Sequence, residues 1–127
     1  MIGVTWPGPC DRIVGYGRDM SMEVPIDSLA AVAAAYGPTA YAVVSTPDAA
    51  PRITHVRPRF EEGPRVRIGV GRRSVDRLRE CGAIGLLWPA GADQSMSLIV
   101  DGELEWADDD GEILVRLISA VRHRPAP

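Results

Sequence analysis

The stretch MSLIVDGELEW, residues 96–106, carries the clearest strand pattern in the chain. Its apolar positions alternate with polar or charged ones, and the apolar set is Met96, Leu98, Val100, Leu104 and Trp106. Because successive side chains of a strand point to opposite faces, this alternation predicts a strand with one face in the core and the other in water. A strand that is wet on one face is typical of an antiparallel sheet.

Segments on both sides of this strand extend the sheet. Residues 39–46 and 52–60 are separated by the turn Pro47-Asp48-Ala49-Ala50, which predicts a hairpin. Residues 65–70 alternate between charged and apolar positions, and residues 83–88 form a short apolar run. Residues 113–121 fit both a helix and a strand; we favour the strand, because the 96–106 strand needs an antiparallel partner.

Two short helices are expected beside these strands. Residues 25–36 start with Pro25 and an acid and stop at Gly37-Pro38. Residues 75–81 follow Ser74, which we expect to cap the helix N-terminus, and stop at Gly82. Six strands and two helices predict a mainly β (α+β) fold, an antiparallel barrel or sandwich with two accessory helices.

The length of 127 residues fits one domain. Residues 1–24 are rich in Gly and Pro and show no periodicity, so we expect a loosely ordered lead-in followed by a single domain over residues 25–127.

Composition indicates the cellular setting. No stretch approaches the ~20 apolar residues of a membrane helix, and the N-terminus lacks a signal-peptide pattern. Cys10 and Cys81 lie far apart and outside any metal-binding spacing, which predicts reduced thiols and no metal site. The net charge of −3 argues against nucleic-acid binding. We therefore expect a cytoplasmic protein with neither a nucleic-acid nor a membrane partner.

The charges are unevenly distributed along the chain. All 14 cationic residues are arginine, and nine of them lie in residues 52–79, whereas residues 93–112 hold eight acids and no arginine. Clustered guanidinium groups suit an anionic, phosphorylated ligand, because arginine is a bidentate donor that is always charged. A solvated basic face is the alternative, and both interpretations remain open.

The sequence Gly69-Val70-Gly71-Arg72-Arg73-Ser74 joins an expected strand to an expected helix. It resembles a dinucleotide fingerprint, but a Rossmann fold is disfavoured because hairpins precede it and the third glycine is absent. A phosphate at this helix start remains an independent hypothesis, supported by Arg72, Arg73, Ser74 and the first backbone amides of the helix.

The strand at residues 52–60 offers a second candidate site. Period-two geometry places His55, Arg57 and Arg59 on one face. A four-residue turn at residues 61–64 would put Arg59 opposite Val66, so the guanidinium groups would share a face with aliphatic side chains and need a bound anion or an internal acid. A one-residue change of register would leave them in solvent. No catalytic set is visible, so a cofactor would have to supply any chemistry.

In their order and spacing, five stretches resemble the pyridoxamine 5'-phosphate oxidase-like family of split β-barrel, FMN-binding proteins. They are TAYAVVSTPDAAPRITHVRPRF, RVRIGVGRRSVDRL, IGLLWP, SLIVDGELE and VRHRPAP. The resemblance implies a six-stranded split barrel that forms a homodimer and binds FMN, or deazaflavin F420, between subunits. It implies that Thr54, His55, Val56 and Arg57 face the flavin ring, and that Arg72, Arg73, Ser74 and Arg77 hold the phosphate.

One position departs from the family pattern. Members commonly carry Lys or Arg two residues after a serine like Ser74, where this chain has Asp76. A carboxylate beside a phosphate is unfavourable. Three functions follow as expectations: an FMN-dependent oxidoreductase acting on a small molecule, an F420-dependent reductase, or a split barrel that has lost its cofactor and serves as a binding module.

Overall fold

Strand β7 (Ser97–Ala107) lies at the centre of an antiparallel sheet in the computed structural model, which describes residues 21–91 and 93–125. The sheet has the order β3-β2-β6-β7-β8-β5-β4, and β1 pairs with β8. The flanking strands are β1 (Ser21–Glu23), β2 (Ala40–Val44), β3 (Arg52–Val56), β4 (Arg59–Glu61), β5 (Arg65–Gly69), β6 (Ala83–Trp88) and β8 (Glu112–His123). The predicted class, a mainly β antiparallel barrel with two accessory helices, is confirmed.

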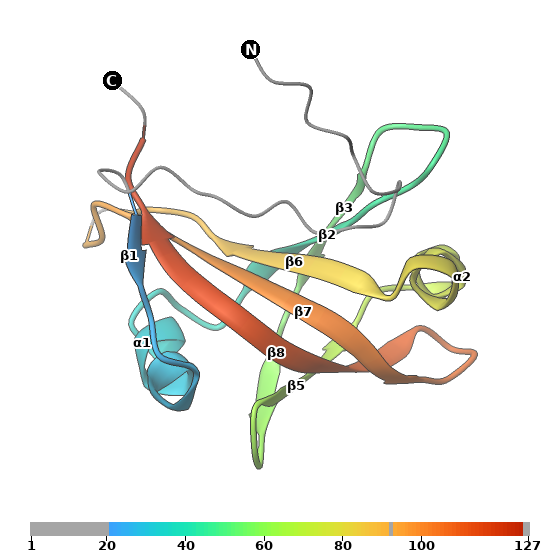
Figure 1. Cartoon of the computed structure of the whole chain (residues 1–127), viewed down its shortest axis with the longest axis horizontal. Helices are drawn as coiled ribbons and strands as arrows, with labels where there is room; N and C mark the ends of the chain where they lie inside the picture. The colour runs from blue at the N-terminus through green and yellow to red at the C-terminus, as the bar shows by residue number, and fades with distance from the viewer. Residues whose placement is uncertain (1–20, 92, 126–127) are drawn as a thin grey trace, which may run out of the picture.

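The strand count differs from the predicted six at two places. The single strand expected at residues 52–60 is interrupted at Arg57-Pro58, so that β3 pairs with β2 at one edge of the sheet while β4 pairs with β5 at the other. This two-residue link carries the chain between the two edges of the curled sheet (Figure 1). Proline suits the break, because it cannot donate a ladder hydrogen bond.

Strand β1 is the second difference, since it falls in the stretch expected to precede the domain. It pairs with the end of β8, with Glu23 opposite Val121, and Val24 is buried. Residues 1–20 of that stretch lie outside the described residues. The ambiguous C-terminal segment is strand β8, as we favoured.

Two short helices lie at opposite ends of the sheet (Figure 1). A 3-10 turn, η2 (Ile26–Ser28), leads into α1 (Leu29–Ala34), and α2 (Arg72–Cys81) ends at Gly82, whose φ of 79° supplies the left-handed cap. No helix in the described part of the chain is long and apolar enough to cross a membrane. The prediction of reduced thiols is wrong for Cys81, which is disulfide-bonded; Cys10 lies outside the described residues.

The core lies inside the curl of the sheet. Alternate residues of β2, β6, β7 and β8 point inward, and Leu86, Trp88, Leu98 and Val100 are among the buried side chains. Trp88 stacks on Phe60 of β4 with ring centroids 6.2 Å apart, so it is a core residue rather than a free surface for a ligand ring.

Candidate functional site

Helix α2 starts three residues earlier than the sequence predicted, at Arg72 instead of Val75. Gly71, with φ of 89°, is its N-cap, and the helix begins at Arg72. Ser74 is therefore the third helical residue instead of the cap, and it is 1% exposed. The prediction of Ser74 as the cap is wrong, because glycine makes the sharp turn from β5 at a φ that other residues rarely adopt.

The turn between β7 and β8 holds the start of α2 in place. The backbone N–H of Val70 donates to the carbonyl of Gly111 at 2.8 Å. The backbones of Gly111 and Gly71 approach so closely that a Cβ added to Gly111 would lie 2.7 Å from the Gly71 Cα. Arg79 donates to Asp109 at 3.1 Å, further along the helix. The helix is thus fixed against a turn rich in aspartate.

Three arginines of α2, which we call the helix arginines, are Arg72, Arg73 and Arg77. Arg72 and Arg73 are exposed and Arg77 is half-buried. Arg72 lies 3.7 Å from Asp110, and both side chains are largely in solvent. Arg73 and Arg77 make no hydrogen bond or ion pair within the described residues. Asp76 is exposed on the same helix.

The first group of predicted cofactor residues lies at the edge of the sheet, with Thr54, His55 and Val56 on β3 and Arg57 in the link to β4. Val56 is buried, Thr54 half-buried, and His55 and Arg57 are exposed. The ring of His55 stacks on Tyr41 of β2, with centroids 4.7 Å apart and an interplanar angle of 18°. In the part of the chain that the structure describes, no hydrogen bond or ion pair joins these four residues to the helix arginines.

The register of the β4–β5 hairpin differs by one residue from the one we expected. Arg59 lies opposite Arg67, and Phe60 opposite Val66. The inward position therefore belongs to Phe60, while Arg57 and Arg59 are exposed. The expectation that these guanidinium groups lie among aliphatic side chains is wrong. Because they are exposed, they do not need a buried anion as a partner.

A second set of arginines, which we call the hairpin arginines, is Arg59, Arg65 and Arg67. Each has a carboxylate partner: Arg59 pairs with Glu112 at 2.9 Å, Arg65 with Glu105 at 3.1 Å and Arg67 with Glu61 at 2.6 Å. The hydrogen bond from Arg67 holds the pKa of Glu61 below its ordinary value. These charges are already neutralised within the fold.

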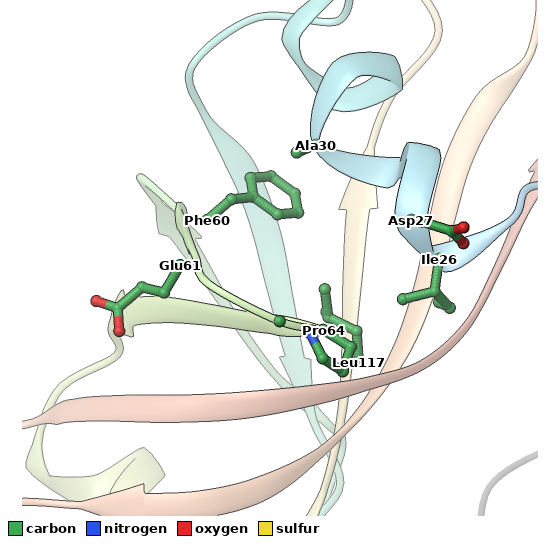
Figure 2. Close-up of a pocket in the computed structure, with 8 residues that line it drawn as sticks. Ile26, Asp27, Ala30, Phe60, Glu61, Pro64 and Leu117 are labelled. Atoms are coloured by element: carbon green, nitrogen blue, oxygen red, sulfur yellow. The ribbon is translucent and has the colours of Figure 1, made fainter.

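The structure also contains a cavity that the sequence did not predict. It lies between η2, α1 and the β4–β5 turn, and it has a volume of about 430 Å³ (Figure 2). None of the eight predicted cofactor residues lines it. No sequence pattern marks the cavity, because its walls come from three distant parts of the chain.

No family model, curated protein or solved structure matches this chain. Within residues 21–91 and 93–125, no group of three or more His, Cys, Asp or Glu side chains could hold a metal ion.

Proposed function

We propose that this chain is an FMN-binding, split-barrel oxidoreductase that acts on a small molecule. The observation that carries the proposal is the start of α2, where exposed Arg72 and Arg73 lie on a helix fixed by the Gly111 turn. The first amides of a helix have no intrahelical acceptor and attract anions. The donor set of amides and guanidinium groups fits a phosphate, and a fixed helix would bind it without a large ordering cost.

Ser74 and Val56 have narrower roles in this proposal than the family pattern suggests. Both side chains are buried, so each residue would contribute backbone groups only. Thr54 and His55 lie on an edge strand, where alternate N–H and C=O groups point away from β2, and Arg57 follows directly after it. Such groups suit the polar edge of a flavin ring, and the stacked pair of His55 and Tyr41 offers a flat surface beside them.

The flavin would supply hydride transfer, and the protein would supply binding and orientation. In this scheme Arg72 and Arg73 balance the phosphate charge, Arg77 adds positive potential, and β3 orients the ring. No acid–base residue is assigned in this scheme.

Two alternatives remain. F420 has a longer acidic tail and would need further cations to bind it. Arg77 and Arg57 would supply that positive charge. A cofactor-free binding module is favoured by two specific observations: Asp76 lies among the helix arginines, and the aspartate turn already approaches Arg72.

The absorption spectrum tests the proposal. Purified protein is mixed with FMN or F420, dialysed and scanned. We expect the protein to retain absorption at about 450 nm if it binds FMN. Retained absorption at about 420 nm would favour F420. Loss of both ligands at micromolar protein would contradict the oxidoreductase. Asp76→Lys then separates the remaining cases: gained binding indicates a decayed site, and continued failure indicates a binding module.

We also propose a homodimer formed through the outer face of β2 and β3. Ile53 is 67% exposed and pairs across the strands with Val43, while Tyr41 is 37% exposed on the same face. Exposed apolar side chains on one sheet face suit an interface. We expect sedimentation analysis to give a dimer that Ile53→Arg converts to a monomer. Met22→Arg, at an apolar residue 54% exposed on β1, is the control. A wild-type monomer at micromolar concentration would contradict the dimer.

A further inference from the structure

The cavity between α1 and the β4–β5 turn results from an irregularity in β8. One edge of β8 pairs with β5 over Arg116 to Glu112 and with β1 only from Val121 onward. Between these two strands the register with β7 shifts, because Asp101 pairs with Ser119 and Gly102 with Leu117. Ile118 is the extra residue of this β-bulge. The bulge bends β8 where β1 and β5 separate, and the cavity occupies that opening.

Backbone hydrogen bonds close both sides of the opening. The N–H of Leu117 donates to the Pro64 carbonyl at 2.7 Å, and the N–H of Val24 donates to the Ala120 carbonyl at 2.9 Å. Gly102 permits the bend, because a Cβ there would collide with the side chain of Val115. The cavity walls are therefore parts of the sheet and not of a free loop.

The lining is apolar inside and acidic at its mouth. Figure 2 shows the Phe60 ring below Ala30 of α1, with Pro64, Leu117 and Ile26 around the same space. The volume of about 430 Å³ lies within the range of small-molecule sites. Phe60 is braced by its stack on Trp88, so the aromatic wall is rigid.

The charged residues of the lining are both acids, Asp27 and Glu61, and no basic residue takes part. Glu61 is neutralised by Arg67, and its carboxylate points away from the cavity in Figure 2. Asp27 is exposed at the opposite rim and forms no hydrogen bond or ion pair within the described part of the chain. In the view of Figure 2 the Asp27 carboxylate also points away from the space beside Phe60, and this exposed side chain would have to rotate to meet a ligand at the rim.

We propose that this cavity is a binding site for a small organic cation, whose apolar, preferably aromatic, body fills the space beside Phe60 while its ammonium group pairs with Asp27. An aromatic body gains area against a rigid ring, and a cation at the half-wet rim keeps part of its hydration. The site shares no residue with the proposed FMN site, so its test is independent of flavin binding.

The test is a titration of the full, flavin-free chain with 2-phenylethylammonium, followed by the amide NMR signals of Ile26, Gly63 and Leu117. For a ligand of this size we expect a dissociation constant on the order of 1 mM. 3-Phenylpropionate, with the opposite charge on a similar body, should bind at least about fivefold more weakly, and Asp27→Asn should weaken the ammonium by about fivefold. Ala30→Leu, which fills the cavity from the helix surface, should abolish binding. Ala31→Leu, at an exposed alanine outside the lining, should leave it unchanged.

Three results would overturn the proposal. They are an absence of shifts at these amides up to about 20 mM ligand, equal affinity for the anion, and shifts that depend on protein concentration without ligand, which would indicate a second copy of the chain. If Ala30→Leu does not fold, the ammonium-to-carboxylate comparison and Asp27→Asn still decide the outcome.

Discussion

The hairpin arginines and the helix arginines come from the same basic stretch of sequence, yet the fold treats them differently. Arg59, Arg65 and Arg67 each pair with a glutamate at 3.1 Å or less. Among the helix arginines, Arg72 has one distant carboxylate and Arg73 has none in the described residues. The clustering of arginine in a sequence therefore overstates the charge available to a ligand, because cross-strand acids neutralise part of it.

The largest effect is expected from a substitution that breaks the backbone contact holding the helix arginines in place. Gly111→Ala adds a Cβ about 2.7 Å from the Gly71 backbone and imposes strain at φ of 105°. We expect a loss of about 3 kcal/mol in the free energy of unfolding, measured with urea. Gly37→Ala is the control, since its φ of 116° carries a similar backbone strain but no atom lies within 4 Å. It should cost about 1 kcal/mol. Equal losses would mean that the turn does not fix α2.

A smaller effect is expected on FMN affinity, which should distinguish the helix arginines from the hairpin arginines. The double variant Arg72→Gln/Arg73→Gln should weaken FMN by roughly tenfold in a fluorescence titration, because it removes two charged donors at the proposed phosphate. Arg59→Gln/Arg65→Gln makes the same change in charge on the paired group and should leave the affinity within about twofold. The reverse order would contradict the distinction between the groups.

The smallest expected effect is on the pH dependence of stability, and it involves one of the acids that pair with the hairpin arginines. Hydrogen bonds lower the pKa of Glu61, through Arg67, and of Asp108, through the backbone N–H of Glu112 and then of Asp110. A lowered folded-state pKa contributes stability above the unfolded value of about 4, and this contribution is lost as pH falls through the folded pKa. Thermal stability should therefore decline below about pH 4. Glu61→Gln should make that decline shallower, whereas Arg72→Gln should not; identical profiles for all three proteins would contradict this assignment.

Local pattern predicted the strands well but not their irregularities. The alternation of residues 96–106 located β7, which spans Ser97–Ala107. It placed Trp106 in the core, whereas the second register shift of β7 turns this side chain outward, 46% exposed and 5.5 Å from the Arg67 guanidinium. A bulge depends on the partner strand, so a single segment does not reveal it.

The candidate site was predicted less completely for a similar reason. The arginines around residues 72–77 were found from composition. Which arginines of the basic stretch meet an acid was not, because the register of the β4–β5 hairpin and the position of the β7–β8 turn decide it. The cavity depends on where β1 and β5 leave β8, and β1 is too short to show a period. Such features arise from long-range pairing, which carries no local sequence signal.

The position of β8 in the sheet has a consequence for synthesis of the protein. β8 pairs with β7, β5 and β1, and within the described residues β1 has no other strand partner. During translation, β1 and one edge of β5 must therefore remain unpaired until β8 has left the ribosome. The sheet can close only after nearly all described residues have been made, so the nascent chain would depend on protection of its apolar strands until then.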